Sequence, residues 1–212
     1  MRKVYWFDLD GTLVSSVNNI KSTIKNYLAK RGVTLTEEVW RVLIVLGYEK
    51  TAEYFIEHYN NPDSVEKIVN DLQKDLIKEY ANEILLKPSV KEYLEKIYNE
   101  GAEMYVVSAS PHCFIDPCLK NNGVHEMFKQ VISVDEYLPY NKSCPEFFEK
   151  IANNLNVNLS DVSYFEDSIM AVETASKIGV KVYAVKDVQP EEDFNKISKM
   201  AYKTVYDYAE LL

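Results

Sequence analysis

The chain has 212 residues, of which 47% are hydrophobic and 27% charged, and these ordinary globular values exclude a disordered or collagen-like chain. Asp and Glu outnumber Lys and Arg by 33 to 24, so the net charge is −9. An acidic chain of this kind argues against nucleic-acid binding driven by phosphate neutralisation and against attachment to anionic membranes. A phosphorylated small molecule remains possible as a ligand, because a site can be locally positive.

The chain carries no apolar stretch near the ~20 residues that cross a bilayer, and its longest apolar run is the six residues 42–47. The opening residues, MRKVYWFDLDG, lack the apolar segment and cleavage site of a signal peptide. Three cysteines are too few, and odd in number, for a disulfide framework. We therefore expect a cytoplasmic protein, a monomer or homodimer, with no membrane or nucleic-acid partner.

Four consecutive apolar residues, 4–7, predict a short strand buried on both faces. Between residues 16 and 86 the apolar residues follow helical spacing, which predicts four helices and no strand. The segment 36–46 within this stretch is helical or buried. A capping-box pattern at Asp63 and Glu66 predicts the start of the longest helix.

After Pro88 the pattern changes to an alternation of strands and helices. A second capping-box pattern, at Ser89 and Glu92, predicts the first helix of this part. Short apolar runs predict strands at 104–107, 131–134, 162–165 and 180–185, with helices between them. This alternation predicts an α/β fold with a doubly wound, Rossmann-like parallel sheet built from residues 1–14 and 87–212. The helical block, residues 15–86, is then a four-helix cap inserted after the first strand.

Polar side chains stand directly after four of the predicted strands. They are Asp8 and Asp10 after the first strand, Ser108 after the second, Lys142 in the loop after the third, and Glu166 and Asp167 after the fourth. Each alone is commonly a turn, a helix cap or a solvated side chain. Ligands of open α/β sheets bind beyond the carboxyl ends of the strands, so together these residues predict one site that combines carboxylates, a hydroxyl and an ammonium.

The segments around these residues resemble the four sequence motifs of the haloacid dehalogenase (HAD) superfamily. The matching segments are Asp8-Leu9-Asp10-Gly11-Thr12-Leu13, Tyr105-Val106-Val107-Ser108-Ala109-Ser110, Lys142-Ser143-Cys144-Pro145-Glu146-Phe147-Phe148 and Tyr164-Phe165-Glu166-Asp167-Ser168. The chain is similar to the branch with an inserted helical cap, which includes phosphoglycolate phosphatases and β-phosphoglucomutases. Two small residues depart from the usual motifs, Ser143 in place of proline and Ala171 in place of glycine.

The resemblance implies a Mg²⁺-dependent phosphatase that hydrolyses a small soluble phosphomonoester through an aspartyl-phosphate. It implies Asp8 as the nucleophile, Asp10 as general acid and base, and Lys142 as the cation that faces both Asp8 and the phosphate. The implied phosphate-binding residues are Ser108, Ala109, Gly11 and Thr12. The implied metal ligands are Asp8, Asp10 through its backbone carbonyl, Asp167, and Glu166 through a water, an oxygen-rich set that suits Mg²⁺.

Two other functions remain as alternatives. The first is a phosphosugar mutase resembling β-phosphoglucomutase, against which stand Thr12, Ile20 and Pro111, where such mutases usually carry valine, histidine and lysine. The second is a binding protein on an inactive core, although every catalytic position holds a competent residue. Haloacid dehalogenation itself is disfavoured, because those enzymes lack the aspartate found at Asp10.

Specificity in capped members of the superfamily comes largely from the cap. The resemblance places the segment 47–50 over the active site, so Lys50 is predicted to reach a second anionic group and Tyr48 to stack on a ring of the substrate. A solvated lysine and a packed tyrosine are the alternative interpretations.

Overall fold

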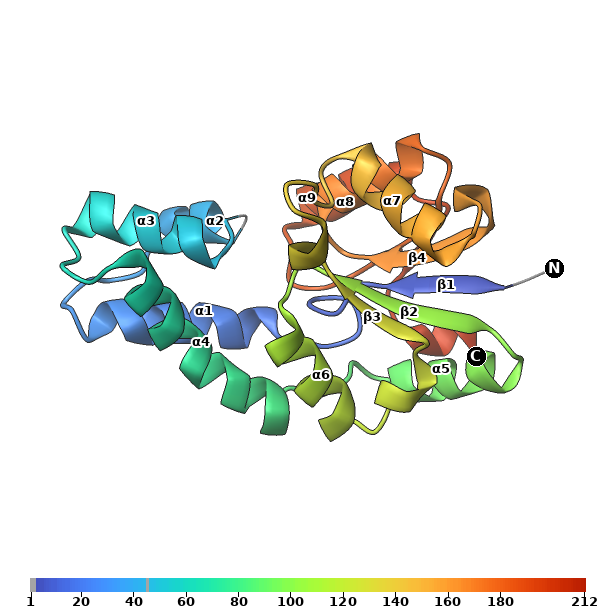
Figure 1. The fold of residues 1–212 in the computed structure, drawn as a ribbon, viewed down its shortest axis with the longest axis horizontal. Helices are drawn as coiled ribbons and strands as arrows, with labels where there is room; N and C mark the ends of the chain where they lie inside the picture. The colour runs from blue at the N-terminus through green and yellow to red at the C-terminus, as the bar shows by residue number, and fades with distance from the viewer. Residues whose placement is uncertain (1–2, 45) are drawn as a thin grey trace. The chain divides into compact units, whose positions relative to one another are not determined.

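The computed structural model describes residues 3–44 and 46–212 (Figure 1). The chain divides into two compact units, one made of Met1–Ser16 with Ile84–Leu212 and the other of Val17–Glu83. The division falls two residues after the first predicted boundary, at 14, and three before the second, at 86. That the smaller unit acts as a cap stays a prediction.

The larger unit is built on a six-stranded sheet in the order β3-β2-β1-β4-β5-β6, in which every neighbouring pair is parallel. This confirms the predicted doubly wound sheet. β1 lies between β2 and β4, where the strand order reverses. The strands are β1 (Val4–Phe7), β2 (Glu103–Ser108), β3 (Gln130–Ser133), β4 (Val162–Glu166), β5 (Lys181–Val185) and β6 (Lys203–Val205).

Helices cover both faces of this sheet (Figure 1). α5 and α6 lie on one face and α7, α8 and α9 on the other, as right-handed crossovers require when the chain winds outward from β1 in both directions. The helices are α5 (Val90–Asn99), α6 (His112–Asn121), α7 (Pro145–Leu155), α8 (Ile169–Lys177) and α9 (Glu191–Met200), with short 3-10 turns at His125–Met127, Val134–Tyr137, Leu159–Asp161 and Tyr208–Leu211.

The central strands are apolar throughout because successive side chains pack against opposite layers. Phe165 of β4 stacks on Phe7, with ring centroids 4.8 Å apart, and lies 5.6 Å from Tyr93 of α5. The preceding residue, Tyr164, faces the other layer and lies 5.7 Å from Phe148 of α7. This double burial explains why a run of apolar residues, rather than an alternating pattern, marked these strands.

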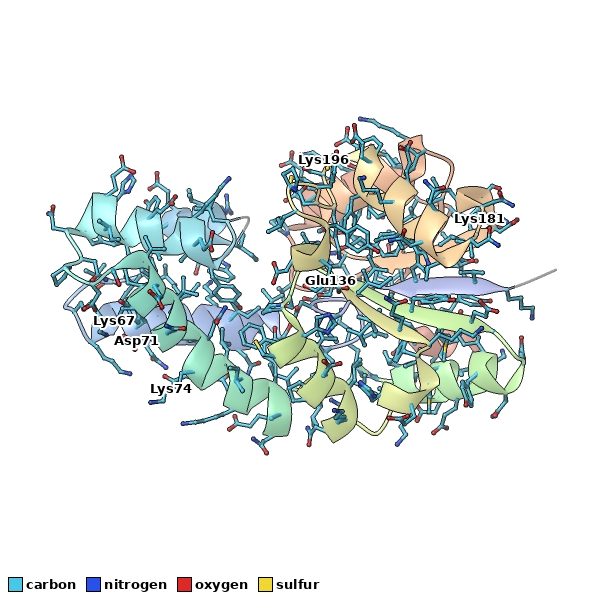
Figure 2. All side chains as sticks on the ribbon, viewed as in Figure 1. Lys67, Asp71, Lys74, Glu136, Lys181 and Lys196 are labelled. Carbon is cyan, nitrogen blue, oxygen red and sulfur yellow. The ribbon has the colours of Figure 1, made fainter. Side chains whose placement is uncertain are left out.

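The smaller unit contains α1 (Val17–Ala29), α2 (Glu37–Leu43), α3 (Tyr48–Tyr59) and α4 (Val65–Asn82), which confirms the four predicted helices. Its core includes Tyr27 of α1 stacked on Phe55 of α3, with centroids 5.6 Å apart. α4 presents charged residues along its solvent side, where Lys67 pairs with Asp71 at 2.6 Å and Lys74 follows one turn later (Figure 2).

Several predicted details differ from the structure. α4 is capped by Ser64, whose hydroxyl accepts from the backbone N–H of Lys67, while Asp63 pairs with Arg31 at 2.6 Å and is not the cap. Ser89 precedes α5 with a left-handed backbone (φ 59°) and makes no side-chain cap bond with any described residue. β6 was not predicted, because its three residues include Lys203 and Thr204 and form no apolar run. Val45, part of the predicted apolar segment 36–46, lies outside the described residues.

The described part of the chain contains no helix that is both long enough and apolar enough to span a bilayer.

Candidate active site

The predicted nucleophile, Asp8, lies at the carboxyl end of the central strand β1. The residue before it, Phe7, pairs with Val106 of β2 and Phe165 of β4, so Asp8 lies between the ends of the two neighbouring strands. Its backbone N–H continues the ladder to the Phe165 carbonyl at 3.0 Å. The side chain is buried. This is the point of strand reversal at which open α/β sheets bind their ligands.

Lys142 joins Asp8 to Glu166. The Lys142 Nζ donates to Asp8 Oδ1 at 2.5 Å and to Glu166 Oε2 at 2.9 Å. Glu166 Oε2 also accepts from the hydroxyl of Tyr164, and Oε1 accepts from the backbone N–H groups of Asp167 and Ser168. Glu166 is thus bonded through both oxygens, and Lys142 is fixed between two buried carboxylates.

Burial and mutual repulsion perturb these carboxylates. Burial, with added repulsion from Glu166 and Asp10, raises the pKa of Asp8 to about 8, although Lys142 opposes the change. Burial likewise raises the pKa of Asp167 well above its usual range, and the charges of Glu166 and Asp8 act in the same direction. Burial would also raise the pKa of Glu166, but Lys142 and the hydrogen bonds from Tyr164 and Ser168 outweigh it and hold that pKa below its usual value. The site therefore concentrates more negative charge than Lys142 alone can offset.

The donor set fits a small divalent cation. Asp8, Glu166 and Asp167 each offer a carboxylate oxygen, and these oxygens lie within 4.8 Å of one another. Lys142 pairs with two of these three carboxylates, Asp8 and Glu166, so the group carries an excess of negative charge that a divalent ion would balance. Hard oxygen ligands of this kind are those that Mg²⁺ prefers.

The carboxylate of Asp10 is held by two hydroxyls. Ser16 Oγ donates to Asp10 Oδ1 at 2.5 Å, and Ser110 Oγ donates to Asp10 Oδ2 at 2.6 Å. Ser110 is itself fixed, because its carbonyl accepts from Ser133 Oγ at 2.9 Å and its N–H donates to Ser108 Oγ at 3.1 Å. The sequence interpretation missed Ser16 and Ser110 as partners of Asp10, although Ser110 lies inside the second motif.

Gly11 and Thr12 shape the loop after β1 around Asp167. Gly11 has φ +82°, and a Cβ built on it would lie 2.3 Å from Asp167 Oδ2, so no larger residue fits without displacing that carboxylate. Thr12 Oγ1 donates to Asp167 Oδ1 at 3.4 Å. The backbone N–H groups of both residues bond within the loop, to the carbonyls of Val14 and Leu9. Their role in phosphate binding stays a prediction, as does that of Ser108, which is buried at the end of β2, and of Ala109, which is exposed beside it.

Tyr48 and Lys50 lie in the first turn of α3, in the smaller unit. Tyr48 is partly buried and packs against the core of that unit, whereas Lys50 is exposed. Their contribution to specificity stays a prediction.

Comparison with known proteins places the chain in a family. A family model described as haloacid dehalogenase-like hydrolase matches residues 5–185. The phosphoglycolate phosphatase of Pseudomonas syringae pv. tomato is 26% identical over 188 residues, which cover 86% of this chain and 69% of that protein.

Two solved structures share the fold. CbbY from Rhodobacter sphaeroides, in complex with phosphate, superposes with a TM-score of 0.83 at 18% identity and covers 100% of this chain and 96% of its own. The β-phosphoglucomutase of Clostridium difficile superposes with a TM-score of 0.79 at 17% identity and covers 100% and 94%. At these identities the two structures establish the fold alone. Since the family model spans most of the sequence, and its motif residues meet at the ends of β1, β2 and β4, the chain belongs to the haloacid dehalogenase-like hydrolases.

Proposed function

We propose that this hydrolase is a Mg²⁺-dependent phosphatase that cleaves a small soluble phosphomonoester through an aspartyl-phosphate on Asp8. The observation that carries the proposal is the cluster of Asp8, Lys142, Glu166 and Asp167, in which Asp8 and Glu166 are buried, with the carboxylate of Asp10 held separately by two hydroxyls. The relatives named as phosphatases support the reaction class. A net charge of −9 argues against nucleic-acid or anionic-membrane partners. We propose a cytoplasmic protein that acts as a monomer or homodimer.

In the first step a carboxylate oxygen of Asp8 attacks the phosphorus. The bond from phosphorus to the leaving oxygen breaks, and Asp10 gives that oxygen a proton. In the second step Asp10 takes a proton from water, the water oxygen bonds to phosphorus, and the bond to Asp8 breaks to release inorganic phosphate. The two serines that donate to Asp10 hold its carboxyl group in one orientation.

The other residues of the cluster would stabilise the negative charge that develops during phosphoryl transfer. Lys142 places positive charge beside Asp8, where charge accumulates as the phosphoryl group is transferred. Mg²⁺, when bound, offsets the repulsion between carboxylate and phosphate as a Lewis acid and template. Asp8, Asp167 and the backbone carbonyl of Asp10 would hold it directly, with Glu166 acting through a water because its oxygens already accept several hydrogen bonds. The Ser108 hydroxyl and the Ala109 N–H would donate to the phosphate.

A screen of metabolite phosphates tests the function. With Mg²⁺ present, we expect release of inorganic phosphate from at least one small phosphomonoester, measured by a phosphate assay. Interconversion of phosphosugar isomers without phosphate release would favour the mutase instead. Ligand binding without turnover of any compound would favour a binding protein and contradict the proposal.

Lys50 provides the test of the predicted specificity segment. Because the core residues would hold the phosphoryl group and the cap the leaving group, Lys50→Ala should change the KM or the ranking among the metabolite substrates. Its rate on a small aryl phosphate should stay near that of the wild type, since that leaving group carries no second anionic group. Lys74→Ala, an exposed lysine on α4 (Figure 2), is the matched control. If Lys50→Ala and Tyr48→Ala both leave the substrate profile unchanged, the segment does not determine specificity.

A further inference from the structure

Lys87 forms a buried ion pair that none of the four motifs includes. Its Nζ lies 2.9 Å from Asp187 Oδ1, and the two side chains are only 10% and 7% exposed. The same ammonium donates to the carbonyl of Gly11 and, at 3.0 Å, to the carbonyl of Lys186. Lys87 also donates its backbone N–H to the carbonyl of Leu13 at 2.9 Å. One residue therefore ties the loop after β1 to the loop after β5.

The position of Gly11 bears directly on Asp167. The Asp167 carboxylate packs so closely against Gly11 that a Cβ added to Gly11 would lie 2.3 Å from Asp167 Oδ2. A shift of Gly11 would therefore change the packing of that carboxylate. Gln189 adds a second connection, because its Oε1 accepts from the Asp187 N–H at 2.6 Å and its Nε2 donates to the Asp167 carbonyl at 3.4 Å. Both connections run from Asp187 to Asp167.

The pair is more than general packing. A buried ion pair contributes little net stability, because desolvation offsets the attraction between the charges. Asp187 Oδ2 is buried and accepts no hydrogen bond from any described residue, so the carboxylate is also incompletely satisfied. Its negative charge acts on Asp167, and the positive charge of Lys87 opposes that effect. An ion pair whose burial costs free energy, placed beside the proposed metal ligand Asp167, points to a role in the active site.

We propose that Lys87 and Asp187 are positioning residues of the active site. They hold the Gly11 carbonyl and so keep the loop that carries Asp8 and Asp10 at a fixed position relative to Asp167. The inference rests on the proposed function, because it assigns Asp167 to the metal. Lys87 fixes the geometry through Gly11, and Asp187 fixes Lys87. Loosening the pair should weaken Mg²⁺ binding and lower kcat, since it would release the Gly11 carbonyl and with it the loop against which the Asp167 carboxylate packs.

The test is the double variant Lys87→Met/Asp187→Asn, which removes both charges with similar side-chain volumes. Removing one partner alone would leave a buried unpaired charge, whereas removing both is often nearly neutral for stability. We expect an unfolding temperature close to that of the wild type without metal. The Mg²⁺ concentration for half-maximal thermal stabilisation, and for half-maximal phosphate release, should rise by about 10–100-fold, the effect typical of residues that support metal ligands.

Two further variants make the outcome decisive. Asp187→Asn alone leaves the Lys87 ammonium without its carboxylate and should lower the unfolding temperature. Lys87 keeps its bonds to the Gly11 and Lys186 carbonyls, so the Mg²⁺ requirement should shift in the same direction by a smaller factor. The control is Glu103→Gln/Lys129→Met, which removes an ion pair of 2.8 Å at the amino end of β2 and should leave the Mg²⁺ requirement unchanged. A wild-type Mg²⁺ requirement in the double variant and in Asp187→Asn, by both readouts, would overturn the proposal. Should the wild-type protein release no phosphate, the proposed function fails, and Mg²⁺-dependent thermal stabilisation still tests the pair.

Discussion

Replacing Asp8 with asparagine is expected to abolish phosphate release. An amide is too weak a nucleophile to attack phosphorus, so the aspartyl-phosphate cannot form. The substitution preserves shape, and Lys142 retains its bond of 2.9 Å to Glu166, so the variant should fold. The measurement is phosphate release on the best substrate of the screen, with the unfolding temperature recorded in parallel.

Asp135→Asn is a suitable control for this variant, because Asp135 is an exposed aspartate of the same unit that follows β3. It should keep the wild-type rate. Phosphate release near the wild-type rate in folded Asp8→Asn would contradict the assignment of the nucleophile.

Removal of the metal is expected to eliminate turnover just as completely. The oxygens of Asp8, Glu166 and Asp167 lie within 4.8 Å of one another, Lys142 pairs with Asp8 and Glu166, and a phosphate dianion would add further repulsion. Excess chelator should therefore stop phosphate release, and added Mg²⁺ should restore it. In Asp167→Ala the Mg²⁺ concentration needed for half-maximal rate should rise sharply, as measured by phosphate release against free Mg²⁺.

The matched control is Asp161→Ala, an exposed aspartate that precedes β4 at its amino end. Its Mg²⁺ requirement should equal that of the wild type. Full activity in excess chelator would rule out the metal-dependent mechanism.

The sequence by itself determined five of the six strands in the described sheet and the residues at its carboxyl edge. A strand packed on both faces must be apolar throughout, so Val4–Phe7 and its counterparts stood out as short apolar runs. The polar residue that ends such a run marks the edge where ligands bind, and Asp8, Ser108 and Glu166 were found in this way. These signals are local, because a strand that is buried on both faces needs consecutive apolar residues in the sequence.

Local sequence signals gave the wrong helix cap for α4 and missed one strand. Asp63 and Ser64 both suit a helix cap, and Ser64 is the cap because Arg31, from the turn after α1, holds the Asp63 carboxylate. β6 carried no signal because a short edge strand with polar residues is not apolar. In both cases the deciding contact lies outside the segment itself.

Only the tertiary structure decided how the site is held together. The hydroxyl of Ser110 reaches Asp10 because β2 and β1 are neighbours, and nothing in either segment specifies that bond. Asp187 follows β5 and so obeys the strand-end rule, but its importance emerges only from its pairing with Lys87, a residue with no motif of its own. Sequence patterns record which side chains are buried and where strands end. The partners of a buried charge depend on which distant segments fold together, and that information exists only in three dimensions.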